Sequence, residues 1–131
     1  MLITIKKVLT DKGPDGKLKR KHLIGIDGRL LHIRSNHAAL NTLLQSAGAI
    51  LMKLATVIFH WEAKKRGLIK GKDYVQIAHV HDEAQFLALP EKADEVGKLF
   101  VEAIEITGRH FGFACPTTGE FKIGPSWAET H

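Results

Sequence analysis

The sequence has 131 residues, of which 44% are hydrophobic and 25% charged, and its formal net charge is +5. These values are typical of one ordinary globular domain and exclude a disordered or fibrous chain. The longest apolar stretch, around Ala47 to Phe59, is interrupted by Lys53, Cys115 is the single cysteine, and the N-terminus lacks a secretory signal, so we expect a cytoplasmic protein outside the membrane.

The first 34 residues predict a helix, a loop and a pair of strands. Leu2, Ile5 and Leu9 have helical spacing, and the glycines and proline of residues 11–16 indicate a loop. Two short strands are expected between residues 17 and 34, joined by a tight turn at residues 26–29. A basic run on the leading strand either protects a sheet edge from aggregation or contacts phosphate. This run consists of Lys17, Lys19, Arg20, Lys21 and His22.

A long helix is predicted over residues 37–66. Either Ser35 or Asn36 can cap its N-terminus, and Gly67 is suited to the position after its C-terminus. Apolar residues at intervals of three and four predict the stripe that faces the core. The stripe consists of Leu40, Leu43, Leu44, Ala47, Leu51, Leu54, Ile58 and Trp61.

The second half of the sequence predicts a β-hairpin followed by a helix. Residues 74–80 and 84–89 are rich in β-branched, aromatic and other apolar residues, and Pro90 ends the second strand. An amphipathic helix is expected over residues 93–110, and an irregular tail after Phe111. Its apolar face comprises Val96, Leu99, Phe100, Ala103, Ile104 and Thr107. The predicted fold class is therefore α+β, with antiparallel β-hairpins packed on two long helices.

The hairpin tip carries the first candidate site. Asp82 and Glu83 are adjacent carboxylates in a turn between apolar strands, next to His81. Carboxylates there are costly to desolvate unless they meet water or a cation, and hard oxygen ligands suit Mg²⁺. The alternative interpretation is an ordinary acidic turn.

The long helix carries the second candidate site. His37, Asn41 and Gln45 are spaced four residues apart, so they share one helix face, which continues to Gly48. Amide donors of this kind can contact the acceptors of the DNA minor groove without selecting a sequence. The alternative is a polar face bonded to a neighbouring loop or to solvent.

Four segments, in this order, resemble the family A DNA polymerases, especially their phage replicative branch. They are residues 26–29 (IDGR), residues 34–49 (RSNHAALNTLLQSAGA), residues 80–83 (VHDE) and residues 124–128 (GPSWA). The resemblance extends over about residues 23–131. It implies a single domain over residues 1–131, the C-terminal part of a polymerase palm, with a remnant of the fingers in residues 1–22.

The resemblance also implies roles for individual residues. Asp82 would bind catalytic Mg²⁺, or Mn²⁺, with Glu83 as a weaker partner, and His81 would lie near the primer terminus. Asn41 and Gln45 would contact the minor groove at the newly formed base pair, and His37 one turn earlier. Arg34 would bind DNA beside them. The partners implied are a DNA primer-template and, in the presence of the fingers, a dNTP.

Two-metal nucleotidyl transfer needs more than one carboxylate pair. The family supplies a second aspartate from a segment Asp-x-Ser-x-x-Glu-x-Arg, which this sequence lacks. We therefore expect the chain to be inactive alone and to need an upstream polymerase polypeptide or to self-associate. Two departures from the family pattern are Asn36, where proline is expected, and the ending Glu129-Thr130-His131.

Two rival functions remain open. One is a small metal-dependent hydrolase, because His79 and His81 resemble the paired histidines of barrel amidohydrolases, although a barrel needs about 200 residues or more. The other is a non-catalytic DNA-binding module.

Overall fold

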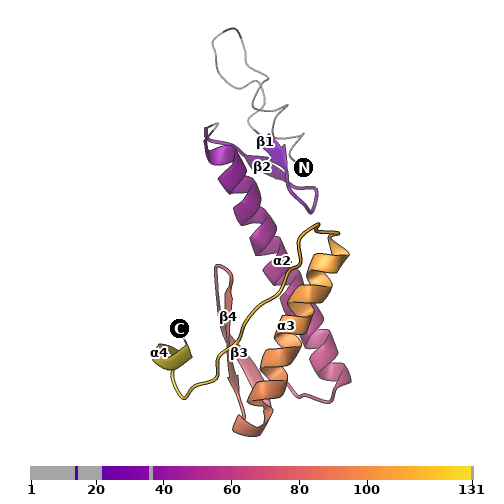
Figure 1. The fold of residues 1–131 in the computed structure, drawn as a ribbon, viewed down its shortest axis with the longest axis vertical. Coiled ribbons are helices and arrows are strands. Elements are labelled where there is room, and N and C mark those ends of the chain that lie inside the picture. Colours follow the sequence, from indigo (N-terminus) through magenta and orange to yellow (C-terminus); the bar gives the residue numbers. More distant parts are fainter. Residues whose placement is uncertain (1–13, 15–21, 36, 131) are drawn as a thin grey trace. The chain divides into compact units, whose positions relative to one another are not determined.

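The computed structural model describes residue 14, residues 22–35 and residues 37–130. The predicted helix at residues 2–9 and the basic residues 17–21 lie outside the described residues. Contacts divide the chain into two compact units, Met1–Ile50 and Leu51–His131. The described elements are helices and two antiparallel hairpins, which confirms the predicted α+β class (Figure 1).

The first unit contains the predicted strand pair and the start of the long helix. Strand β1 (His22–Ile24) pairs antiparallel with β2 (Leu30–His32). The turn between them is held by a backbone hydrogen bond of 2.8 Å from Gly25 to Arg29. A small buried cluster joins the hairpin to the helix, and it consists of Leu23, Ile33, Ala39 and Leu43.

Helix α2 (Ala38–Lys65) lies within one residue of the predicted range 37–66 at each end. Its N-terminal turn is capped by Ser35, whose Oγ accepts a hydrogen bond of 3.3 Å from the backbone N–H of Ala38. At the other end Gly67 adopts φ 78°, which glycine tolerates best. The Leu68 N–H donates to Ala63 O at 2.9 Å, and the Gly67 N–H donates to Lys64 O at 3.1 Å. These two bonds form a Schellman motif.

The predicted apolar stripe of α2 is wrong at three of its eight residues, while Leu43 is buried and Leu51 and Ile58 pack against the second unit's core. Leu40, Leu44 and Trp61 are 50%, 59% and 64% exposed. The fully buried residues of α2 include three alanines that the stripe omitted, and they comprise Ala39, Leu43, Met52, Ala55, Phe59 and Ala63. Apolar residues occur on several faces of α2, so periodicity alone does not identify the buried one. By length and composition α2 also qualifies as a membrane-spanning helix, a test that core helices of soluble proteins pass too.

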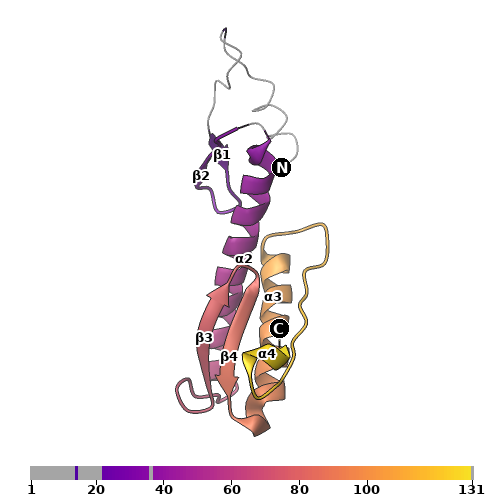
Figure 2. The ribbon, with the colours of Figure 1, turned by 90° about the vertical axis from the view of Figure 1, so that its left-hand side faces the viewer.

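The second unit packs a hairpin and one helix on the C-terminal part of α2 (Figure 2). Strand β3 (Tyr74–Val80) pairs antiparallel with β4 (Glu83–Ala88), and the register shifts between Gln76 and Ala78, so Ile77 forms a bulge. A 3₁₀ turn (Pro90–Lys92) leads into helix α3 (Ala93–His110). All six residues of the predicted α3 stripe are buried, which confirms that prediction.

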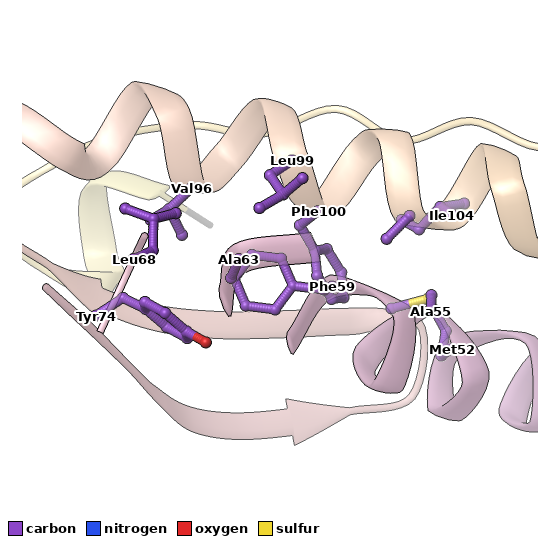
Figure 3. Close-up of a cluster of buried hydrophobic side chains, with 11 residues drawn as sticks. Met52, Ala55, Phe59, Ala63, Leu68, Tyr74, Val96, Leu99, Phe100 and Ile104 are labelled. Carbon is purple, nitrogen blue, oxygen red and sulfur yellow. The ribbon is translucent and has the colours of Figure 1, made fainter. Parts of the chain in front are cut away.

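Phe59 is the centre of the second unit's core (Figure 3). Its side chain is 0% exposed. Its ring lies 5.1 Å from that of Tyr74, 4.9 Å from that of Phe86 and 5.5 Å from that of Phe100. Aromatic contacts of this kind add to the free energy of area burial. The sequence predicts one core, whereas the described residues form two buried clusters, one in each unit.

The tail follows α3 back along its length (Figure 2) and ends in a short helix, α4 (Trp127–Thr130). Two glycines of α3 make room for it. A Cβ atom at Gly97 would overlap the ring of Phe121, and one at Gly108 would overlap the side chain of Thr117. The Thr117 hydroxyl donates a hydrogen bond of 3.2 Å to Ile104 O. The tail is therefore fitted to the backbone of α3.

Candidate functional site

The tip of the second unit's hairpin is a two-residue turn. Val80 pairs with Glu83, which leaves His81 and Asp82 as the turn residues. Strand β4 thus begins one residue earlier than predicted, because Glu83 joins the ladder. His81 has φ 53° and is the one non-glycine residue with positive φ in the described part of the chain. Positive φ at the first turn residue suits tight hairpins, but it is uncommon for residues with a Cβ atom.

The two carboxylates of the tip have different surroundings. Asp82 is exposed, and no described residue donates a hydrogen bond or forms an ion pair with its side chain. Glu83 is half-buried and accepts a hydrogen bond from the Gln85 side chain. Because residues two apart on a strand share a face, Glu83 and Gln85 lie side by side on the outer face of the hairpin. Asp82 is therefore the carboxylate that is free to meet a cation.

The donor set of the tip fits Mg²⁺ better than zinc. A single exposed carboxylate with a second one beside it suits an ion that keeps several waters and shares phosphate ligands. Among the described residues there is no group of three or more His, Cys, Asp or Glu side chains that would hold a metal by themselves. A zinc centre of a hydrolase needs at least three protein ligands, and the described residues bring no such set together around His79 and His81.

The amide row of the first unit consists of His37, Asn41 and Gln45. All three side chains are exposed, and none makes a hydrogen bond to a described residue. The row continues to Gly48, where an added Cβ atom would meet nothing within 4 Å. The sequence left open that the row bonds to a neighbouring loop or to solvent, and no loop among the described residues bonds to it. The donors therefore face outward on an open helix surface.

Arg34 is exposed between the end of β2 and the start of α2, in the same unit as the amide row. It carries the positive charge nearest in sequence to that row, which suits contact with phosphate. His81, Asp82 and Glu83 belong to the second unit, and Arg34, His37, Asn41 and Gln45 belong to the first.

The second unit also contains a hollow of about 490 Å³ that was not predicted from the sequence. The residues that line it come from the end of α2, the following loop and the start of β3, and they include His60, Lys64, Lys70 and Tyr74. The signal available in the sequence was a polar His60 directly after the apolar residues of the long helix. The site depends on how the loop after Gly67 folds back, which spacing does not reveal.

Comparisons with known proteins give one family. The profile of DNA polymerase family A matches residues 9–129. The DNA-directed DNA polymerase of Escherichia phage T7 is 43% identical over 118 residues, and that of Enterobacteria phage T3 is 42% identical over 118 residues. Each of these alignments covers 88% of this chain and 17% of the relative. DNA polymerase I of Aquifex aeolicus is 29% identical over 125 residues, which are 95% of this chain and 20% of that relative.

Proposed function

The chain belongs to DNA polymerase family A, and on this premise we propose that it forms the C-terminal part of a polymerase palm and serves template-directed nucleotidyl transfer in DNA replication. The chain spans about one fifth of its relatives' length. Its role is therefore that of one part of a catalytic assembly. The observation that carries the proposal is an exposed, unengaged Asp82 on a tight turn, within a sequence that matches the family.

Asp82 is the proposed metal ligand, and Glu83 is a weaker or indirect one. When bound, Mg²⁺ or Mn²⁺ would polarise the primer 3′-hydroxyl and neutralise charge on the leaving pyrophosphate. The Asp82 side chain has no hydrogen-bond or ion-pair partner among the described residues. One of its carboxylate oxygens would therefore be available to the metal ion at the reacting end of the primer. Glu83 is already hydrogen-bonded to Gln85, which suits a supporting role. His81 would contact the primer terminus from the same turn.

The amide row is the proposed minor-groove contact. Asn41 and Gln45 would donate to purine N3 and pyrimidine O2, which occupy similar positions in every correct base pair. His37 would make the same kind of contact one turn earlier, and Arg34 would bind a neighbouring phosphate. The exposure of the row and the open space at Gly48 support a close approach of the duplex.

The β4 edge of the second unit's hairpin is the proposed docking site for the rest of the polymerase. Only two strands are described in this sheet, and β3 carries a bulge at Ile77, which twists an edge away from further pairing. Strand β4 has no bulge, and its residues Glu83 to Ala88 pair one by one with residues of β3. Leu87 of β4 is 65% exposed, so an added strand would also cover apolar surface. A second copy of the chain is the competing occupant of this edge.

A chimeric enzyme tests the proposal. The C-terminal segment of the phage T7 polymerase that aligns with this chain is replaced by the chain itself, and primer extension is measured with Mg²⁺ and with Mn²⁺. We expect template-directed synthesis, its loss in Asp82→Ala, and retention of primer-template binding in that variant. Glu120→Ala, an exposed carboxylate on the tail, is the matched control and should extend primers normally.

Two results of this experiment would contradict the proposal. Full synthesis by the Asp82→Ala chimera would show that Asp82 is not the metal ligand. Robust synthesis by the 131 residues alone would show that no second source of carboxylates is needed. A chimera that binds primer-template with a steep salt dependence but never extends it would favour the non-catalytic DNA-binding module.

A further inference from the structure

The hollow at the C-terminal end of α2 is a site of mixed aromatic and cationic character. Two turns of α2 contribute His60 and Lys64, the loop contributes Leu68, Ile69 and Lys70, and β3 contributes Tyr74. Its volume of about 490 Å³ is within the range of small-molecule sites. Gly67, which the Schellman motif requires, leaves the rim open because an added Cβ atom there would meet nothing within 4 Å.

One wall of the hollow is the half-buried His60 ring, which lies against the buried Tyr74. The Tyr74 hydroxyl lies 2.9 Å from His60 Nδ1, and the two rings stack at an interplanar angle of 20°. Tyr74 is 3% exposed and is fixed against Phe59 in the core. Burial, and secondarily the charge of Lys70, lowers the pKa of His60, so its imidazole is neutral at pH 7. A neutral aromatic wall favours a flat, uncharged group beside it.

The charge of the hollow is positive and uncompensated. Lys64 and Lys70 are exposed, and neither forms an ion pair with a described residue. The neighbouring cations differ, because Lys65 pairs with Glu62 at 2.5 Å and Arg66 pairs with Glu102 at 2.6 Å. Two free ammonium groups at one rim are suited to an anion, and lysine binds phosphate as a point charge.

An exposed indole lies next to this rim. Trp61 precedes Lys64 by three residues on α2, so their side chains are neighbours on the helix surface. Its side chain is 64% exposed, an unusual state for the largest aromatic residue. An open indole beside lysines is the combination that holds a nucleobase by stacking and its phosphate by charge.

We propose that Trp61, Lys64, Lys70 and the His60–Tyr74 wall form a nucleotide-binding site for the base and phosphate of a free nucleotide or of single-stranded DNA. The site is separate from the hairpin tip. Tyr74 begins β3 and the tip follows Val80, so the length of the strand places them roughly 20 Å apart. An acidic peptide would satisfy the lysines equally, but it would leave the indole and the aromatic wall without a matching flat group.

Tryptophan fluorescence of the full chain tests this site. In a Trp127→Phe chain Trp61 is the remaining tryptophan, and titration with dTMP should quench its emission to saturation. Lys64→Gln and Lys70→Gln should each raise the dTMP concentration needed by about tenfold, the usual loss for a charge-assisted contact. Lys53→Gln, an exposed lysine of α2 outside the hollow, is the matched control and should have no effect. Calorimetric titration of the unsubstituted chain repeats the measurement if Trp127→Phe fails to fold.

Further ligands identify the source of the nucleotide. Tighter binding of oligo(dT) than of dTMP, with the same dependence on Lys64 and Lys70, would indicate a DNA strand, and equal binding would indicate a free nucleotide. Quenching by inorganic phosphate at the same concentrations, or by polyglutamate with the same lysine dependence, would overturn the proposal. So would an absence of saturable binding of either nucleotide ligand, or an equal effect of Lys53→Gln.

The outcome is independent of the proposed polymerase role. The Asp82→Ala chain should bind dTMP as the unsubstituted chain does. Loss of binding in Asp82→Ala would overturn the separate site, whereas failure of the chimera to extend primers would leave it unaffected.

Discussion

The hydroxyl of Tyr74 lies 2.9 Å from Nδ1 of His60, and the centroids of the two rings are 5.8 Å apart. The contact joins the last turns of α2 to the first residue of β3. Burial raises the pKa of Tyr74 and, together with the charge of Lys70, lowers the pKa of His60. At pH 7 the pair therefore joins a neutral phenol and a neutral imidazole.

The first prediction concerns the pH dependence of stability. Since the pKa of His60 is lowered from 6.5 by folding, the unfolded chain binds more protons at this residue just below pH 6.5. Its contribution to stability should be fully present above pH 6.5 and should be lost as the pH falls through the lowered pKa. Urea midpoints between pH 7.5 and 5 should fall less steeply for His60→Phe. A slope equal to that of the unsubstituted chain would contradict this, and His79→Gln is the exposed control.

The second prediction concerns the core of the second unit. Phe59→Ala should lower the free energy of unfolding by about 3 to 5 kcal/mol, because a fully buried ring is lost and a cavity remains. Trp61→Ala, two residues further along α2 and 64% exposed, should change it by less than about 0.5 kcal/mol. Urea unfolding followed by circular dichroism compares the two. Equal losses of unfolding free energy in the two variants would mean that the Trp61 side chain is buried in solution.

The third prediction concerns glycines in helices. Gly108→Ala should destabilise the chain by about 1 to 3 kcal/mol, because its Cβ atom overlaps Thr117. Gly48→Ala, in the interior of α2 with free space around it, should stabilise by about 0.5 to 1 kcal/mol. Thermal unfolding measures both. Adding Thr117→Ala to Gly108→Ala should recover part of the loss, and no recovery would show that the overlap is not the cause.

The fourth prediction concerns the hairpin tip. His81 has φ 53°, a conformation that glycine adopts without penalty and β-branched residues adopt poorly. His81→Gly should therefore stabilise the chain by up to about 1 kcal/mol, and His81→Val should destabilise it by more than that. In the chimera, His81→Gly should nevertheless extend primers more slowly, because the proposed contact with the primer is lost. Unchanged extension by this variant would assign His81 to the turn alone.

The fifth prediction concerns the amide row. Asn41→Ala with Gln45→Ala should weaken primer-template binding of the chimera about thirtyfold, since two hydrogen bonds of about 1 kcal/mol each are lost. The loss should be similar for different template sequences, because minor-groove acceptors are shared by all correct pairs. Ser46→Ala, a half-buried neighbour on α2, is the control. A loss confined to one template sequence would contradict groove contact of this kind.

Clear amphipathic patterns made much of the fold predictable. Helix α3 matches its predicted bounds and buried face because its polar and apolar residues separate cleanly. Helix α2 was located to within one residue, but its buried face was predicted only in part, since Leu40 and Leu44 are exposed and Ala39 is buried. Small buried residues carry little hydropathy signal, so only tertiary packing decides between such faces.

The residues of the candidate site stay a prediction, and the structure adds their local geometry. Asp82 and the amide row were identified by residue type and spacing, and their exposure agrees with the expected contacts. The positive φ of His81 accompanies the two-residue turn that the register of β3 and β4 sets. That register depends on a bulge at Ile77, for which alternation of residues gives no sign.

The tail packs directly on Gly97 and Gly108 of α3. The residue that gives the most stable chain at these two positions therefore depends on a segment more than eight residues away. Glycine is a poor helix former, so with the tail in place it is the favoured residue, and with the tail removed alanine would be. Shortening the chain before Thr117 should therefore reverse the sign of the Gly108→Ala effect. A preference that looks local to one helix is in this way set by its neighbour.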